Sequence, residues 1–388
     1  MKIVVTHPSL NRGGGAERVC LTTIKALVQK GHEVRLATID KTDWKFLERR
    51  YGRLWRPSKE SHIVETMPVK GTISQAIFTV SCFLPELVLL SNEAESDLVI
   101  NTYGDLVDSI VDVSYINAIP ARLAYQYPQT FAFTSFPLLL MGQSYGLFLR
   151  ALETLGRRRT LIANSKFLQD VIRRHLRRDS LVVYPPVDTQ MFKQKASKAN
   201  LENAVLTVTR VRSGKRLELI PRIARLTRKA TYTIVGLVDQ ASQSALSVLK
   251  KAIDSQGVHD RVRLVTNRPF QELLAAYTSA KLYLHTQQTE SFGISIVEAM
   301  AAGCVPIVPR DGGPWFDILD QKQGEYGYSY DTVGEAARYV RVLLDDEQLR
   351  RDISRRAQIR AMDFDSAVFE RKIQNFVRAI QASAVKSN

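Results

Sequence analysis

Short apolar, β-branched runs alternate with longer segments of helical period along the whole chain. The apolar runs predict five strands in each half: Lys2–Thr6, Glu33–Thr38, Asp97–Asn101, Thr160–Asn164 and Leu181–Tyr184, then Ala204–Val208, Thr231–Val235, Arg261–Val265, Lys281–His285 and Cys304–Val308. Segments such as Ala16–Lys30 and Ser165–Leu176 have the helical period and lie between them. Strands that alternate with helices are typical of parallel sheets, so the pattern indicates an α/β protein.

A stretch that can continue neither a strand nor a helix separates the two series. Pro185 and Pro186 stop regular structure, and Lys193–Asn203 is polar. A single core rarely grows beyond roughly 250 to 300 residues, whereas this chain has 388. We therefore predict two doubly wound, Rossmann-like domains, residues 1–190 and 191–365. We expect a last helix within residues 366–388 to pack back on the first domain.

The net charge, the first residues and the cysteines indicate which partners and which cellular location to expect. The net charge of +15 indicates an anionic partner, which can be a nucleic acid, an acidic membrane surface or a phosphorylated substrate. The chain begins with a strand-like run that lacks the features of a signal peptide, so we expect a cytoplasmic protein. Cys20, Cys82 and Cys304 lack the C-x-x-C spacing of disulfide or zinc sites.

The segment Glu290–Gly303 carries the strongest candidate chemistry. Gly293 permits close approach of the backbone at the start of a helix, and Gly303 suits the end of that helix. A helix N-terminus at the carboxyl edge of a parallel sheet attracts phosphate groups. Glu290 and Glu298, eight residues apart, are placed to hold two hydroxyl-bearing parts of one ligand, such as a sugar and a ribose. In the alternative interpretation, Glu290 caps the helix and Glu298 pairs with a surface base.

Two cations follow the first strand of the second half. Arg210 and Lys215 lie on either side of the turn before the next helix, beside Gly214. Together they are placed to neutralise a diphosphate at this edge of the sheet. The alternative is a solvated basic loop.

A glycine-rich loop joins the first strand to the first helix. Gly13, Gly14 and Gly15 let a substrate approach the N–H groups at the start of that helix. The loop is not a G-x-G-x-x-G fingerprint, and Asp40 lies farther on than the ribose-binding acid of a dinucleotide site. A nucleotide-dependent oxidoreductase or epimerase remains an alternative on this loop alone.

Five segments together resemble the family 4 retaining glycosyltransferases: His7–Pro8, Gly13–Arg18, Tyr184–Asp188, Arg210–Lys215 and Glu290–Glu298. The resemblance covers most of the chain. Within that family, Gly312–Pro314 followed by Asp317–Ile318 is similar to the segment that follows the paired glutamates in one subgroup. This subgroup comprises the GDP-mannose-dependent mannosyltransferases that extend lipid-linked oligosaccharides.

The resemblance implies a GT-B fold, in which two Rossmann-like domains face a central cleft, with the donor in the C-terminal domain and the acceptor mainly in the N-terminal one. It implies catalytic roles for Glu290 at the transferred sugar and for Arg210 and Lys215 at the diphosphate. It places Glu298 on the ribose. The further donor-binding residues are Ser291, Phe292, Gly293, Ile294, Gly14 and Gly15, and the acceptor-side candidates are His7, Arg18, Ser114 and Tyr115. The nucleotide sugar is then a cosubstrate, and neither a cofactor nor a metal is expected.

One position departs from the subgroup, which carries a histidine in a Val-His-Tyr-Pro-like stretch. This chain reads Val113-Ser114-Tyr115-Ile116, so Ser114 stands at the matching position. Because of this departure, the identity of the acceptor stays open. A front-face retaining reaction does not require a base there, because the leaving phosphate helps to deprotonate the acceptor.

Three stretches bear on the surroundings of the acceptor. Ala76–Leu90 and Phe131–Met141 are unusually apolar, although the first is too short and interrupted to span a bilayer. Arg150–Ser180 contains nine lysines and arginines against three acidic residues. The apolar stretches fit either a buried core or peripheral contact with a membrane that holds a polyprenyl-linked or glycolipid acceptor. We expect association with the cytoplasmic face of the membrane.

Other features have simpler explanations. Asp363-Phe364-Asp365 has the D-x-D spacing of metal-dependent transferases, but Asp365 precedes a helical segment and is a natural N-cap. The six histidines lack the spacing of metal ligands, so His175 and His285 are interpreted as ordinary surface or packed residues.

The sequence thus predicts a retaining glycosyltransferase that moves mannose from GDP-mannose to a lipid-linked glycan or glycolipid. The alternative within the same fold is a UDP-sugar-dependent enzyme of cell-surface polysaccharide or glycolipid synthesis. An oxidoreductase gives no reason for the pair Glu290 and Glu298. We expect no nucleic-acid partner, because the sequence contains no recognised nucleic-acid-binding motif.

Overall fold

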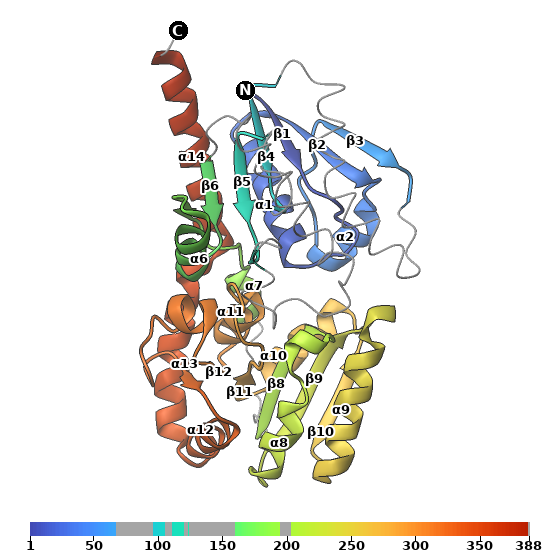
Figure 1. Ribbon diagram of the computed structural model, residues 1–388, viewed down its shortest axis with the longest axis vertical. Coiled ribbons are helices and arrows are strands. Elements are labelled where there is room, and N and C mark those ends of the chain that lie inside the picture. Colours follow the sequence, from blue (N-terminus) through green and yellow to red (C-terminus); the bar gives the residue numbers. More distant parts are fainter. Residues whose placement is uncertain (67–95, 105–110, 120–122, 124–159, 195–202, 387–388) are drawn as a thin grey trace. The chain divides into compact units, whose positions relative to one another are not determined.

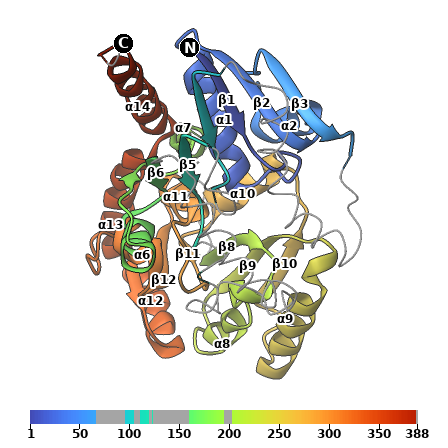
Figure 2. The same cartoon turned by 45° about the horizontal axis from the view of Figure 1, so that its top comes forward.

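The computed structural model describes residues 1–66, 96–104, 111–119, 123, 160–194 and 203–386. These residues form two compact units, each with a parallel sheet and helices (Figure 1, Figure 2). The chain passes from the first unit to the second after Pro186 and returns to the first after Asp365, beside the predicted boundaries at 190 and 365. The apolar stretches Ala76–Leu90 and Phe131–Met141, residues 150–159 of the basic stretch and Cys82 lie outside the described residues.

The first unit contains a seven-stranded parallel sheet in the order β3-β2-β1-β4-β5-β6-β7. Its strands are β1 (Lys2–Thr6), β2 (Glu33–Asp40), β3 (Lys59–Val64), β4 (Leu98–Asn101), β5 (Val113–Ile116), β6 (Thr160–Ala163) and β7 (Leu181–Val182). The five predicted strands are present, β1 with the predicted ends and the others with ends that differ by one or two residues, whereas β3 and β5 were not predicted. Strand β1 lies between β2 and β4, and the chain leaves it first to one side and then to the other.

Helices α1 (Gly15–Val28), α2 (Trp44–Tyr51), α6 (Lys166–Leu176) and α14 (Ser366–Lys386) complete the described part of this unit. Helix α14 buries Phe369, Ile373 and Val377, which recur every four residues, in the core of the first unit. The Lys25 ammonium on α1 lies 2.7 Å from the Glu370 carboxylate. The last helix therefore packs back on α1. None of the helices in the described ranges is both long and apolar enough to cross a membrane.

The second unit contains a six-stranded parallel sheet in the order β10-β9-β8-β11-β12-β13. Its strands are β8 (Ala204–Arg210), β9 (Thr231–Leu237), β10 (Val262–Thr266), β11 (Leu282–Leu284), β12 (Val305–Pro309) and β13 (Tyr328–Tyr330). The last of these, β13, was not predicted. Its helices are α7 (Thr189–Gln194), α8 (Leu219–Arg225), α9 (Gln243–Gln256), α10 (Phe270–Ser279), α11 (Ile294–Ala301), α12 (Val333–Asp345) and α13 (Glu347–Ala361). Short 3₁₀ or π turns lie at Ser213–Lys215, Gln240–Ser242, Pro314–Ile318 and Met362–Phe364.

Apolar side chains of the central strands form the core of this unit. Val205, Ile234, Leu282 and Ile307, one from each of four neighbouring strands, are at most 1% exposed. Such continuous burial is expected of parallel strands that are covered on both faces. The polar residues that remain for chemistry therefore gather at the carboxyl ends of the strands.

Two glycines after β12 support the loop that follows β11. A Cβ atom on Gly312 would lie 2.5 Å from the Glu290 carbonyl oxygen, and one on Gly313 would lie 2.2 Å from the Ser291 carbonyl oxygen. The Gly313 N–H donates to the Glu290 carbonyl at 2.8 Å. The Asp311 carboxylate accepts from the Thr289 N–H at 2.8 Å. The two loops are thus in backbone contact, which only glycine permits.

We predict that Phe369→Ala weakens the first unit. Phe369 is 1% exposed and meets Tyr115 edge to face at 6.0 Å between ring centroids. The substitution should lower the free energy of unfolding of this unit by about 3–5 kcal/mol, measured by urea titration. Arg378→Ala, at an exposed position of the same helix, is the control and should change it by less than about 0.5 kcal/mol. Equal stability of Phe369→Ala and the control would contradict the packing of α14.

We also predict that Gly313→Ala destabilises the second unit by at least about 2 kcal/mol, because the added methyl group collides with backbone atoms that cannot move aside locally. Thermal and urea unfolding measure the effect. Gly334→Ala in α12 is the matched control, since the nearest atom to its added Cβ is 3.8 Å away. If the two variants unfold alike, the close approach of the loops is not rigid.

Candidate functional site

The candidate site lies where the order of strands in the second sheet reverses. The chain runs outward from β8 to β10 on one side and then crosses over to β11 on the other side of β8. The loops that leave β8 and β11 diverge at such a point, and open α/β sheets bind ligands there. The loop after β8 carries Lys215, and the loop after β11 carries Glu290. The sequence predicted both residues for one site, and the structure brings them together.

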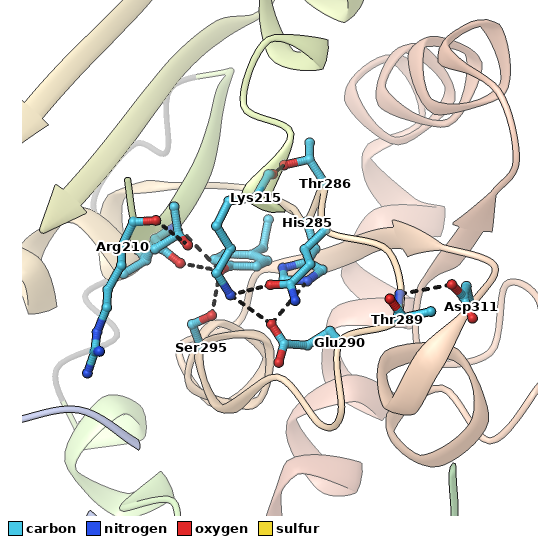
Figure 3. Close-up of polar contacts among 12 residues, drawn as sticks. Arg210, Lys215, His285, Thr286, Thr289, Glu290, Ser295 and Asp311 are labelled. Carbon is cyan, nitrogen blue, oxygen red and sulfur yellow. Dashed lines mark hydrogen bonds and ion pairs between the residues drawn. The ribbon is translucent and has the colours of Figure 1, made fainter. Parts of the chain in front are cut away.

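The Lys215 ammonium and the Glu290 carboxylate form an ion pair at the centre of the site. The Nζ atom lies 2.9 Å from Oε2, and the two side chains are 26% and 21% exposed (Figure 3). The Lys215 ammonium also donates to the Gln287 side-chain carbonyl. The Thr286 hydroxyl donates to the Lys215 main-chain carbonyl at 2.6 Å. The loop after β11 therefore contacts both the main-chain carbonyl and the ammonium of Lys215.

The pair keeps Glu290 ionised. Burial by itself raises the pKa of this carboxyl, but the Lys215 ammonium opposes burial, and the net pKa lies below its ordinary value. In such a partly exposed pair, the carboxylate can accept from hydroxyl groups and the ammonium can attract anionic groups.

His285 lies on the other side of Glu290. Its ring is buried, and Nε2 is 3.8 Å from Glu290 Oε2 (Figure 3). Burial lowers the pKa of His285 to about 4, while Glu290 raises it and Lys215 lowers it. The imidazole is therefore neutral near pH 7. The interpretation of His285 as an ordinary packed residue missed its contact with the site.

Helix α11 begins at this site with Gly293 as its N-cap residue, at a φ of 103°. Gly293 thus supplies the left-handed conformation that turns the chain from the Glu290 loop into the helix. Ser291 is buried, and the Phe292 ring packs edge to face on Phe364 at 5.3 Å. Of the predicted donor-binding residues, Phe292 therefore has its side chain in the interior, and only its backbone is left to meet a ligand.

Glu298 lies in the second turn of α11 and is 6% exposed. Its carboxylate accepts a 2.8 Å hydrogen bond from the Tyr277 hydroxyl. In the first turn, Ser295 Oγ lies 2.8 Å from the Tyr283 hydroxyl, which donates to the Val208 carbonyl at 3.0 Å. This contact joins α11 to β8 and β11. The two tyrosines were not predicted, because neither lies in the Glu290–Glu298 segment.

Arg210 does not join Lys215 in this conformation. It is the last residue of β8, and its side chain extends away from the Lys215 ammonium and from Glu290 (Figure 3). Both cations thus lie at the carboxyl end of β8, as predicted. Their charged groups, however, do not lie side by side. A rotation of the Arg210 side chain would be needed before both contact one diphosphate.

The first unit places the glycine-rich loop and His7 at its own point of strand reversal, after β1 and beside β4. The Gly14 N–H donates to the Glu17 carboxylate at 2.8 Å, and the Tyr51 hydroxyl donates to the Gly14 carbonyl at 3.1 Å. Gly15 is the first residue of α1. Glu17 thus occupies the anion-binding position that the sequence assigned to a donor at Gly14 and Gly15.

Four acceptor-side candidates fall into two groups. His7 Nδ1 lies 3.0 Å from the Thr102 hydroxyl, and the Arg18 guanidinium lies 5.6 Å from the centre of the Tyr51 ring. By contrast, Ser114 and Tyr115 are each 1% exposed, and the Tyr115 hydroxyl donates to the Val183 carbonyl at 2.8 Å. Their strand β5 is buried along its length, so both side chains lie in the interior of the unit.

The D-x-D segment has structural contacts. Asp363 pairs with Arg360 at 2.9 Å, and the Thr189 hydroxyl donates to Asp365, the residue before α14, at 2.5 Å. Across the ranges that the structure describes, acidic, histidine and cysteine side chains form no group that could hold a metal ion.

Comparison with protein families identifies the second unit. Residues 188–360 match the model for glycosyl transferases group 1. Among curated relatives, a GDP-Man:Man(3)GlcNAc(2)-PP-Dol alpha-1,2-mannosyltransferase of Xenopus laevis is 31% identical over 206 residues, 49% of this chain and 42% of that protein. The Caenorhabditis elegans protein of the same name is 28% identical over 211 residues, 50% of this chain and 45% of that protein. The chain spans less than half the length of these curated relatives.

Solved structures of other proteins have a similar fold over nearly the whole chain. HepE of Anabaena, crystallised with UDP and glucose, has a TM-score of 0.71 and 20% identity, with 97% of this chain and 99% of that chain covered. Sucrose-phosphate synthase of Thermosynechococcus elongatus has a TM-score of 0.74 and 15% identity, with 99% and 100% covered. The prediction of a GT-B fold with two Rossmann-like domains is confirmed, and residues 188–360 are similar to glycosyl transferases group 1.

Proposed function

We propose that the protein is a retaining, metal-independent glycosyltransferase that moves mannose from GDP-mannose to a lipid-linked glycan. The observation that carries the proposal is the Lys215–Glu290 pair at the point of strand reversal, within the glycosyltransferase group 1 domain. The names of the curated relatives support the choice of donor and acceptor, since they specify GDP-mannose and a dolichol-linked oligosaccharide.

Each charged group has a distinct task in this proposal. Glu290 contacts the hydroxyl groups of the transferred sugar, and Glu298 contacts the ribose. Lys215 exchanges part of its contact with Glu290 for the diphosphate, and Arg210 turns towards the same group. A cation fixed in a partly buried site stabilises the negative charge that develops on the diphosphate as the glycosidic bond breaks. These side chains supply the positive charge that a metal ion supplies in other transferases.

The transfer itself breaks the bond between the anomeric carbon and the β-phosphate oxygen. The acceptor hydroxyl oxygen forms the new bond to the same carbon on the same face of the sugar, which retains its configuration. The acceptor proton passes to the departing diphosphate, so no enzyme base is required. This route is compatible with Ser114, which is buried in β5 at the matching position of the family histidine.

The proposed acceptor implies a membrane surface as partner, on its cytoplasmic face. A lipid-linked glycan is held in the bilayer by its polyprenyl chain, and the net charge of +15 favours approach to anionic headgroups.

We predict that GDP and GDP-mannose raise the melting temperature of the purified protein, whereas UDP-glucose, UDP-N-acetylglucosamine and NAD do not. A ligand that binds only the folded state stabilises it by mass action, by about 2.7 kcal/mol at a hundred times its dissociation constant. A thermal-shift series measures this without an acceptor. Stabilisation by the UDP compounds alone would mean that the donor is a UDP-sugar and not GDP-mannose. Stabilisation by NAD alone would overturn the proposed function.

Substitutions at the ion pair should abolish transfer and leave the protein folded. We expect Glu290→Gln and Lys215→Ala to lower the turnover number at least about 100-fold, because each removes a charge that acts on the reacting groups. Transfer of radiolabelled sugar to lipid-linked acceptor measures the rate, and circular dichroism checks the fold. Lys229→Ala, which breaks the exposed pair between Lys229 and Asp345, is the control and should remain fully active. Full activity of either ion-pair variant would refute the site.

A further inference from the structure

His285 lies beside the Lys215–Glu290 pair, and the proposed function gives it no task. Its main chain is fixed on both sides at the end of β11: the N–H donates to the Ile307 carbonyl at 2.9 Å, and the carbonyl accepts from the Tyr330 hydroxyl at 2.8 Å. The imidazole is thus attached to the sheet and not to the following loop. A side chain on such a rigid base is well placed for discrimination between ligands.

One nitrogen of this ring lacks a hydrogen bond. His285 is 5% exposed, yet among the described residues Nε2 has no hydrogen-bond partner. The Glu290 Oε2 atom is 3.8 Å away. Buried polar atoms are rarely left without a partner, and a persistent exception at the ligand-binding edge of a sheet indicates a partner that the ligand supplies.

The charge of the His285 imidazole determines which kind of ligand group it can bind. Burial lowers the pKa of His285 to about 4, against the raising effect of Glu290, so the ring is uncharged near pH 7. A neutral imidazole has one donor and one acceptor nitrogen, which suits a hydroxyl group. The positive charge that a diphosphate requires is supplied instead by Lys215, which contacts Glu290 from another direction (Figure 3).

We propose that His285 and Glu290 together bind one hydroxyl group of the transferred sugar, which makes His285 a specificity-determining residue of the donor site. An oxygen atom about 2.8 Å from each of these two side-chain atoms, themselves 3.8 Å apart, satisfies both hydrogen bonds. The hydroxyl donates to the carboxylate and accepts from Nε2–H. The inference rests on the proposed function, because it requires a nucleotide sugar in this site.

Calorimetry separates the sugar from the nucleotide. Binding of GDP and of GDP-mannose is measured for wild-type protein and for His285→Ala; UDP and UDP-glucose replace them if the thermal-shift series selects UDP compounds. We expect His285→Ala to bind the nucleoside diphosphate like wild type and the nucleotide sugar about tenfold more weakly, as for the loss of one hydrogen bond. His285→Gln, which keeps a donor, should recover part of the affinity. The control is His259→Gln, at an exposed histidine 3.5 Å from Asp254, which should change neither.

Other outcomes overturn the inference in distinguishable ways. If His285→Ala weakens both ligands equally, or neither, then His285 does not read the sugar, although the proposed function stands. If wild-type protein binds no nucleotide sugar, both proposals fail.

A second measurement avoids any loss of folding in the variants. In wild-type protein with ¹⁵N-labelled histidine, the Nε2 resonance of His285 should move when the nucleotide sugar is added and stay in place with the nucleoside diphosphate. Equal movement with both ligands would contradict a contact with the sugar.

Discussion

The ion pair between Lys215 and Glu290 is the interaction on which the site depends. Two charges that are each about three-quarters buried are costly to keep apart, so the loops after β8 and β11 must hold them within contact. The geometry follows from this constraint: Thr286 fixes the backbone of Lys215, Gln287 accepts from its ammonium, and the Asp311–Gly313 turn fixes the backbone of Glu290. Three neighbouring strand ends, those of β8, β11 and β12, are thereby joined through polar contacts.

The same constraint explains why small residues surround the pair. Gly312 and Gly313 admit the backbone of the Glu290 loop at distances that no Cβ atom allows, and Gly293 turns that loop into α11. Close backbone contact fixes the direction of Glu290 without adding charged groups that would compete for it. The Glu290 carboxylate is therefore held in one direction by the fold.

Most of the fold follows from the sequence, because periodicity reports burial. The ten predicted strands exist. Strand β1 has the predicted ends, and the ends of the others differ by at most two residues; β8, for example, runs on through Thr209 and Arg210. The missed strands β3, β5 and β13 have six, four and three residues. Strand β3 reads Lys-Glu-Ser-His-Ile-Val at the edge of its sheet, so its pattern lacks the apolar run of a central strand.

The site was predictable only in part, for a physical reason. Position at a strand end follows from the order of elements, so Lys215 and Glu290 could be assigned to one edge. Side-chain direction depends on tertiary packing instead: Arg210 extends away, Tyr115 turns into the core, and Phe292 packs on Phe364. His285 shows the converse, since a strand-ending histidine could pack or face the site, and the sequence does not distinguish the two.

The two points of strand reversal, one in each unit, resemble each other in one respect and differ in charge. Each holds a buried histidine whose pKa burial lowers to about 4, His7 in the first unit and His285 in the second. At the first, the Glu17 carboxylate already satisfies the Gly14 N–H at the start of α1, which disfavours an anion there. At the second, the Lys215 ammonium shares its charge with one carboxylate and remains 26% exposed. The two points therefore differ in charge: a carboxylate meets the helix start at the first, and a partly exposed ammonium lies at the second.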